Sequence, residues 1–224
     1  YVCLMQASEL ISSSLIPLHP NDSGSKALAL MDENKISHLA VVRNNFYLGL
    51  ISEDEILNWE NPNEYISEHL SELDSTHVTQ DQYLISILKT IEQNKLSAVA
   101  VLDDKKQYLG TISNSKLLFS IAKSTSVQSP GGIIILKMKE IDYSMGEIAR
   151  IIESNNAKIL SSLINSSVEN HFIELTLKLN TVDISAILKD LERFDYQLEA
   201  SYNQGNTSLN YDDRYAALML YLNQ

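Results

Sequence analysis

The sequence contains little cysteine, glycine and positive charge, and each shortage excludes a class of protein. A single cysteine, Cys3, has no partner for a disulfide within the chain, which is typical of a reducing cytoplasm. The seven glycines are scattered and form none of the glycine-rich loops that cradle phosphates in common nucleotide-binding enzymes. No run approaches the roughly 20 apolar residues that a membrane span needs. We therefore expect a cytoplasmic protein.

The charge balance is strongly acidic. The chain has 17 Lys and Arg residues against 29 Asp and Glu, which gives a formal net charge of −12 at pH 7 and a pI near 4.8. Such a charge repels nucleic-acid backbones and anionic lipid head groups unless a basic patch compensates, and the one basic cluster is Lys105-Lys106. Nucleic acid and membranes are therefore not expected as direct partners.

Motifs of catalysis are also missing. The sequence contains no G-x-S-x-G, no Walker A loop and no H-E-x-x-H. Its five histidines are spread along the chain, without the i, i+4 pairing or the carboxylate companions that a zinc site favours. We expect no enzyme active site, no catalytic residue and no metal.

What the chain does have is an internal duplication. The segment Lys35–Val42 returns loosely as Lys95–Leu102, 60 positions later, and Tyr47–Ser52 returns as Tyr108–Ser113. In each copy an apolar stripe at helical spacing precedes two short strands, and a serine then begins a second helix. Two copies that each leave an apolar face uncovered are expected to pack on each other. The cleft between the copies is the first place to look for function.

The C-terminal half follows a different pattern. Residues 124–132, rich in Ser and Gly and interrupted by a proline, predict an interdomain linker. From 133 to 203 the predicted elements follow the order βαββαβ, which lays two helices on one face of a four-stranded sheet. Residues 209–223 predict an amphipathic C-terminal helix, whose apolar stripe we expect to support a homodimer.

The first half resembles a tandem pair of CBS (cystathionine-β-synthase) domains. ALALMDENKISHLAVV followed by YLGLISEDEIL is similar to that family's signature, and the second repeat follows it more loosely. The resemblance implies two βαββα-type repeats, at 6–65 and 66–123. Residues 133–203 resemble an ACT domain through their βαββαβ order and the run ILKMKEIDYSMGEIARII. The expected fold class is α/β, of the α+β kind, and the layout resembles the acetoin-utilisation accessory proteins.

The resemblance implies regulation. CBS pairs generally bind adenine nucleotides or adenosyl compounds between their repeats, so AMP, ATP and S-adenosylmethionine are the implied ligands. ACT domains commonly bind amino acids or other small metabolites, and both folds usually act on another protein. The alternative is a ligand-free oligomerisation or interaction protein whose CBS and ACT sites are degenerate.

The ligand motif of the CBS family is G-h-h-S/T-x-x-D, in which the hydroxyl contacts phosphate and the acid accepts from ribose. Its positions here are Gly49, Ser52 and Glu55 in the first repeat and Gly110, Ser113 and Lys116 in the second. Glu55 keeps the acid, one methylene longer, whereas Lys116 replaces it with a cation that cannot accept a hydrogen bond. Ser52 and Glu55 either hold an adenosyl ligand or form only a helix capping box, worth about 1 kcal/mol. Lys116 either neutralises a phosphate or is an ordinary exposed helix residue.

Four further residues complete the candidate adenosyl cleft. Ile16, Leu18 and Leu39 are the expected apolar walls around the base. His38 either lines the cleft or is a histidine packed beside a buried strand.

Asp142 and Gly146 are the candidates in the ACT-like segment. The resemblance implies an acid and a glycine in the loop between the first strand and first helix, where backbone N–H groups approach a carboxylate ligand. The family spacing is D-x-x-G, and here it is one residue longer. A solvated loop acid and a turn glycine are therefore the alternative.

Overall fold

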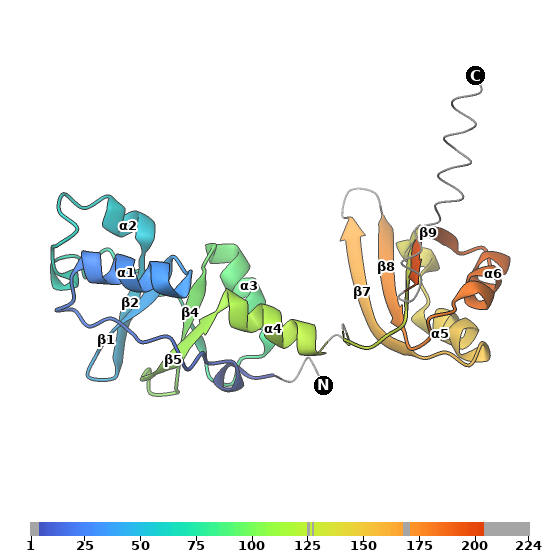
Figure 1. The fold of residues 1–224 in the computed structure, drawn as a ribbon, viewed down its shortest axis with the longest axis horizontal. Helices are drawn as coiled ribbons and strands as arrows, with labels where there is room; N and C mark the ends of the chain where they lie inside the picture. Colours follow the sequence, from blue (N-terminus) through green and yellow to red (C-terminus); the bar gives the residue numbers. More distant parts are fainter. Residues whose placement is uncertain (1–4, 125, 127, 168–170, 204–224) are drawn as a thin grey trace, which may run out of the picture. The chain divides into compact units, whose positions relative to one another are not determined.

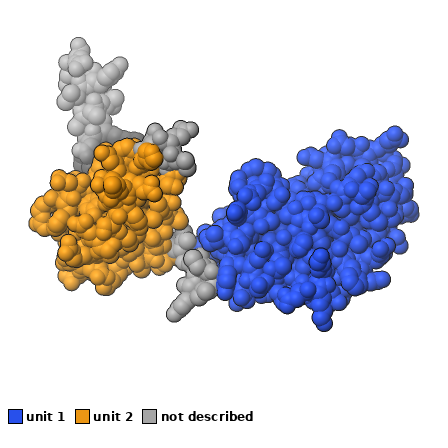
Figure 2. Space-filling view, turned by 180° about the vertical axis from the view of Figure 1, so that it is seen from behind, with its two compact units in different colours: residues 1–124 blue, residues 125–224 orange. Residues whose placement is uncertain are grey.

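The computed structural model describes residues 5–124, 126, 128–167 and 171–203. The chain divides into two compact units, Tyr1–Ser124 and Thr125–Gln224, which are coloured separately in Figure 2. The helix predicted over 209–223 lies outside the described residues. Within the described ranges, no helix is both long enough and apolar enough to cross a membrane.

Unit 1 contains the two repeats, and the predicted order of helix, strand, turn, strand and helix is confirmed in both (Figure 1). The elements of the first repeat are α1 (Gly24–Asn34), β1 (His38–Arg43), β2 (Phe46–Ser52) and α2 (Glu53–Leu57). Those of the second are β3 (His77–Thr79), α3 (Leu84–Asn94), β4 (Ala98–Leu102), β5 (Tyr108–Ser113) and α4 (Asn114–Ser124).

The same local signals shape both repeats. Lys35 and Lys95 end α1 and α3 in the left-handed backbone region, with φ of 53° and 52°, and thereby turn the chain into the next strand. The antiparallel pairs β1–β2 and β4–β5 each shift register at the equivalent place, Val41/Val42 and Val101/Leu102. The duplication is therefore visible in the irregularities of the backbone as well as in its regular elements.

The segments that lead into the two repeats cross between them. Ser12 donates its N–H to the carbonyl of Thr111 in β5 at 2.9 Å, and the same segment then runs beside β1 at Leu18. In the second repeat Asp74 exchanges two backbone hydrogen bonds with Leu50 of β2, at 2.7 and 2.9 Å, before β3 runs parallel to β4. The sequence did not predict this exchange, which ties each repeat to the strands of the other.

The repeats share a hydrophobic core, so the predicted packing of the two copies on each other is confirmed. One buried cluster combines Ala40 and Leu50 of the first repeat with Val99, Val101 and Ile112 of the second. A separate cluster lies between the strands and helices of the first repeat and also includes Ala98 at the start of β4. Apolar side chains buried in these two clusters thus stabilise the strands of unit 1, in addition to the hydrogen bonds of the crossing segments.

Unit 2 is a four-stranded antiparallel sheet with α5 and α6 on one face (Figure 1). Its elements are β6 (Gly132–Lys139), α5 (Met145–Ser154), β7 (Ile159–Ser167), β8 (Phe172–Leu179), α6 (Ser185–Arg193) and β9 (Gln197–Asn203). The strands lie in the order β7-β8-β6-β9, which is the ferredoxin-like arrangement of a βαββαβ chain. The predicted fold class is confirmed.

Two element boundaries in unit 2 differ from the apolar pattern. The pattern predicts a helix from Val182, but Ile184 is buried before the helix begins, and Asp183 accepts the N–H of Ser185 at 3.0 Å. α6 therefore starts at Ser185. The apolar residues from 157 onward also predict a strand, but it starts at Ile159, because Asn156 has a left-handed φ of 58° and the chain is still turning there.

Candidate functional site

The motif positions of both repeats lie at the same edge of the strands of unit 1. Ser52 ends β2 opposite His38, the first residue of β1, and Ser113 ends β5 opposite Ala98, the first residue of β4. The starts of β1 and β4 are bonded to each other, because the hydroxyl of Ser97 lies 3.1 Å from His38 Nδ1. The structure therefore brings the two predicted ligand turns to one edge, with His38 between the repeats.

In the first repeat, Ser52 and Glu55 form a reciprocal capping box at the start of α2. Ser52 Oγ accepts the N–H of Glu55 at 3.1 Å, while Glu55 Oε2 accepts the N–H and the hydroxyl of Ser52 at 2.7 and 2.9 Å. Glu55 is half-buried and held in place as an acceptor. The first turn of this five-residue helix is Glu53-Asp54-Glu55, and three adjacent carboxylates repel a phosphate. The turn is thus suited to accepting hydrogen bonds and poorly suited to binding an anion.

In the second repeat, the serine hydroxyl is enclosed by the protein. Ser113 is 6% exposed. Its Oγ lies 3.2 Å from the hydroxyl of Ser12 and 3.0 Å from that of Ser115, and it accepts the N–H of Lys116 at 3.3 Å. A ligand would have to displace Ser12 to reach it. Lys116 itself is half-buried in the first turn of α4, which reads Asn114-Ser115-Lys116 and lacks the carboxylates of α2.

The motif glycines are required by the crossing segments. A Cβ on Gly49 would lie 2.6 Å from Cβ of Leu73 and 3.0 Å from the carbonyl oxygen of Asp74. A Cβ on Gly110 would overlap with Cγ2 of Ile11, which occupies the equivalent place in the other crossing segment. The sequence assigned these glycines to a ligand motif. In the structure they make room for the chain itself.

His38 is a half-buried histidine that links the repeats. Its Nδ1 lies 3.1 Å from the hydroxyls of Ser37 and Ser97 and accepts the N–H of Ser97 at 3.3 Å, which leaves the ring proton on Nε2. Burial lowers the pKa of His38, and the negative charges of Glu55 and Asp74 oppose this shift without reversing it. His38 is therefore neutral at pH 7.

The three apolar candidates have different surroundings. Leu18 and Leu39 are fully buried in the core of the first repeat, whereas Ile16 is 69% exposed. The structure does not bring the three side chains together as one open wall, and Ile16 alone of the three presents its side chain to solvent.

Glu55 also lines a hollow of about 700 Å³ that the sequence did not suggest. The other residues of this hollow are Asn58, Trp59, Glu60, Glu64, His69 and Glu72. The rings of Trp59 and His69 stack with centroids 3.8 Å apart, and His69 has a carboxylate at each ring nitrogen. The expectation that the histidines lack carboxylate companions is thus wrong for His69, because the chain folds back between Glu64 and Glu72. Among the described residues, no group of three or more His, Cys, Asp or Glu side chains is arranged to hold a metal ion.

Of the two residues predicted in the loop of unit 2, Asp142 ends a short 3-10 turn, whereas Gly146 lies in the first turn of α5 and not in the loop. Asp142 lines a hollow of about 500 Å³ at the ends of β6 and β9. The other lining residues are Lys137, Met138, Lys139, Glu147, Phe172, Phe194, Asp195, Tyr196 and Gln197. Gly146 is not one of them, and a Cβ on it would meet nothing within 4 Å. Within the described residues, no close contact therefore requires a glycine there.

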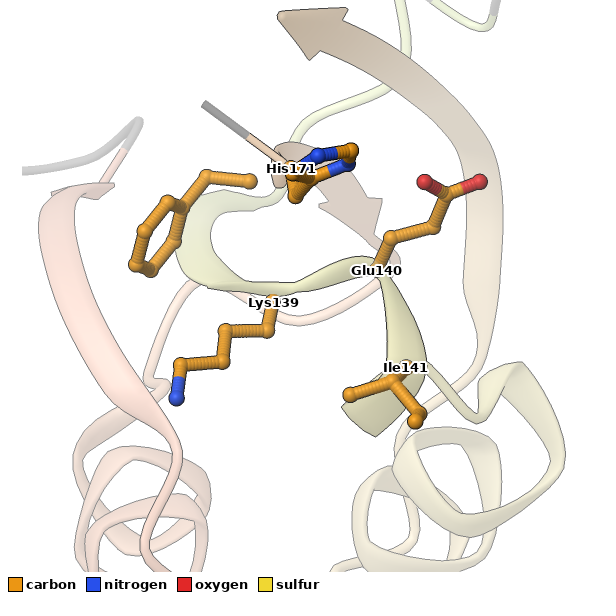
Figure 3. A pocket seen from close by; sticks show the side chains of 5 residues that line it. Lys139, Glu140, Ile141 and His171 are labelled. Carbon is orange, nitrogen blue, oxygen red and sulfur yellow. The ribbon is translucent and has the colours of Figure 1, made fainter. Parts of the chain in front are cut away.

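A second hollow of unit 2, of about 420 Å³, shares Lys139 and Phe172 with the first. Figure 3 shows its lining, which includes Glu140, Ile141 and His171. The end of β6 and the start of β8 thus carry two adjoining hollows with charges of both signs.

Residues 7–61 match the family model of the CBS domain. This range covers the first repeat from its crossing segment to the end of α2 and includes Gly49, Ser52 and Glu55. Because the second repeat reproduces the same elements, unit 1 has the fold of a CBS domain pair. The similarity of residues 133–203 to an ACT domain, and of the whole layout to the acetoin-utilisation proteins, stays a prediction.

Several solved structures are similar to this chain. A CBS domain pair/ACT domain protein from Thermotoga maritima is 11% identical with a TM-score of 0.47, and the match covers 53% of this chain and 98% of that one. The CBS domain of a bacterial CNNM/CorC family Mg²⁺ transporter, in complex with ATP, is 16% identical with a TM-score of 0.43, over 53% and 87%. CBSX2 in complex with AMP is 16% identical with a TM-score of 0.42, over 53% and 96%. These ligands are properties of those proteins.

Proposed function

We propose that this chain is a non-enzymatic regulatory protein whose first repeat binds an adenine nucleotide or related adenosyl compound. CBS-domain proteins are generally regulatory, and the family match covers the repeat that keeps the acid of the ligand motif. The observation that carries the proposal is the fixed, half-buried carboxylate of Glu55 at the edge where the two ligand turns meet.

Glu55 is suited to accept hydrogen bonds from ribose. The two bonds that hold its side chain in the capping box both fall on Oε2, so Oε1 is the oxygen assigned to the ribose hydroxyls. A hydrogen bond to an ionised carboxylate contributes about 1.5–3 kcal/mol. Exposed Ile16 supplies apolar surface for the base, and neutral His38 adds no charge beside it.

The charges at this edge favour a ligand that carries little negative charge. Glu53, Asp54 and Glu55 would repel a triphosphate at the start of α2, whereas Lys116 at the start of α4 supplies one positive charge. We therefore place any phosphate toward Lys116 and expect AMP or S-adenosylmethionine to bind more tightly than ATP.

For unit 2 we propose a small zwitterionic metabolite, such as an amino acid, in the hollow that Asp142 lines. Lys137 and Lys139 supply positive charge there, and Asp142 and Glu147 supply negative charge. Such a ligand would regulate a partner protein together with the adenosyl ligand, provided that the two ligands bind alternative arrangements with different affinity.

A ligand-free assembly protein is the second candidate. The enclosed hydroxyl of Ser113 and the engaged Oε2 of Glu55 both favour it. On α4, Leu118 and Phe119 are each 66% exposed, which offers apolar surface for association. Under either candidate we propose a homodimer in the cytoplasm.

Calorimetry of the full chain with AMP, ATP and S-adenosylmethionine separates the two candidates. Binding is expected for the wild type and is expected to weaken in Ser52→Ala. The matched control is Ser23→Ala, because Ser23 caps α1 by accepting the N–H of Lys26 at 3.3 Å and lies outside the proposed site. Both variants lose a cap worth about 1 kcal/mol, but only the first should lose affinity. Absence of binding by the wild type at millimolar ligand would favour the assembly protein.

A further inference from the structure

Four side chains in the segment that follows α2 form one connected group, here called the His69 cluster: Trp59, Glu64, His69 and Glu72. His69 Nε2 lies 2.8 Å from Glu64 Oε2, and Nδ1 lies 3.1 Å from Glu72 Oε1. The ring of His69 stacks on Trp59 at an interplanar angle of 10°, and Trp59 Nε1 donates to Glu72 Oε2 at 3.3 Å. Every member therefore contacts His69.

This geometry requires a protonated histidine. A neutral imidazole carries one N–H and one lone pair, so it can donate to one carboxylate only and turns its lone pair toward the other. The imidazolium donates to both, and each bond is charge-assisted. Burial lowers the pKa of His69, but the hydrogen bonds and charges of Glu72 and Glu64 outweigh it, so the pKa lies above its ordinary value of 6.5.

Among the described residues that line the hollow, His69 is the one that can carry a positive charge. Glu55 and Glu60 line the same hollow and add two more carboxylates. On the side of α1, Gly24 packs against Trp59 and donates its N–H to the carbonyl of Glu64 at 3.1 Å.

The charged side chain in this part of α1 is Lys26, and it forms an ion pair with Asp22 at 2.6 Å. Loss of the His69 proton would therefore leave the carboxylates of the cluster facing one another without a cation between them.

The cluster is connected to both sides of the Ser52 turn. Glu72 is followed directly by Leu73, which covers Gly49, and by Asp74, which pairs with Leu50 in β2. Glu55, which caps the Ser52 turn, lines the same hollow as Glu72. A change in how Glu72 is held is thus passed within two residues to the strand that ends at Ser52.

We propose that His69 is a pH-sensitive latch, which in its protonated form holds Glu64 and Glu72 together within the segment 59–72 and on deprotonation releases one carboxylate and loosens that segment. The latch rests on the contacts of the His69 cluster alone and does not require a bound nucleotide. It closes toward acidic pH and opens toward alkaline pH.

The single tryptophan of the chain is in the cluster, so its emission reports the latch directly. A stacked imidazolium quenches indole fluorescence, and we expect emission of the full, ligand-free chain to rise in one step between about pH 5 and about pH 9. The midpoint should lie above 6.5. In Glu72→Gln the midpoint should move to lower pH, because one of the two stabilising charges is lost. In His69→Gln the step should disappear.

His77→Gln is the matched control, since His77 is an exposed histidine of unit 1 whose ring meets Tyr47 edge-on and not the tryptophan. It should leave the step unchanged. The proposal is overturned if the wild type shows no step or has a midpoint at or below pH 6.5. It is also overturned if the midpoint does not move in Glu72→Gln or if the step persists in His69→Gln. Circular dichroism verifies that each variant is folded. Where a variant does not fold, the presence and midpoint of the step in the wild type still test the proposal. Because no ligand is present, failure of nucleotide binding leaves this test intact.

Discussion

The two repeats of unit 1 share one backbone plan and differ in the chemistry of their ligand turns. The first ends β2 with a half-buried capping box and an acidic five-residue helix. The second ends β5 with an enclosed serine and an eleven-residue helix whose first turn carries Lys116. The duplication has thus preserved the scaffold, including glycines that accommodate the crossing segments, while the two turns have become chemically unlike. A turn with a hydrogen-bond acceptor, Glu55, and a turn with a cation, Lys116, therefore lie at the same edge of the strands of unit 1.

The largest effect is expected where the repeats are alike. Gly49→Ala and Gly110→Ala should each lower the free energy of unfolding by about 1–3 kcal/mol, because a Cβ overlaps with the crossing segment in both repeats. Urea titration followed by Trp59 emission measures this in unit 1. Gly146→Ala is the control, and circular dichroism should show that it stabilises unit 2 by about 0.5–1 kcal/mol, because its helix position is open. Tolerance of alanine at Gly110 would show that the crossing segment does not constrain it.

The next effect distinguishes the two serines. Ser113→Ala should cost about 1–3 kcal/mol, because it removes a buried hydroxyl that contacts the hydroxyls of half-buried Ser12 and of Ser115 and also caps α4. Ser52→Ala should cost only about 1 kcal/mol, the usual worth of an N-cap. The same urea titrations compare them. Equal costs would mean that the second turn is no more enclosed than the first.

A charge reversal tests the difference between the two helix starts. Lys116→Asp gives α4 an acid in its first turn, which the positive helix N-terminus should stabilise by about 0.3–1 kcal/mol at low ionic strength. Thermal unfolding in low and high salt measures the gain and its screening. Destabilisation by this variant would indicate that Lys116 has a structural contact that the geometry of the turn does not reveal.

The smallest effect is confined to a pH window. The folded pKa of His38 is lowered, so its contribution to stability is present above the ordinary value of 6.5 and is lost as pH falls through the folded value. The stability difference between wild type and His38→Asn should therefore shrink toward acidic pH. His69, whose pKa is raised, should show the opposite trend: its contribution is present below 6.5 and lost as pH rises through the folded value. Parallel slopes for the two histidines would contradict this account.

The sequence predicted the architecture because the signals for it are local. Apolar spacing and the serine that begins the second helix act within a few residues and identify the elements of both repeats. The βαββαβ order of unit 2 is likewise predicted from the local pattern of each element.

The parts that the sequence missed depend on contacts between distant segments. Ile11 and Leu73 reach the motif glycines only because the lead-in segments cross, and no local pattern marks that crossing. Trp59 and His69 come together because the segment between them folds back. The sequence signal for this cluster was a tryptophan, a histidine and several glutamates within 14 residues. Which of these side chains contact one another is seen only in the folded chain. Leu18 and Leu39 were assigned to a ligand wall from position alone, and burial places them in the core.

Calorimetric titration of AMP into Glu55→Gln and Glu53→Gln tests the proposed ligand site most directly. Both variants remove one negative charge from the first turn of α2, and glutamine at 55 keeps an oxygen for the capping box. The account predicts that Glu53→Gln, which removes a repelling charge, binds at least as tightly as the wild type and that Glu55→Gln binds about 10-fold or more weakly, the loss of one charge-assisted hydrogen bond. Equal affinity of the two variants, or no binding by the wild type, would contradict it.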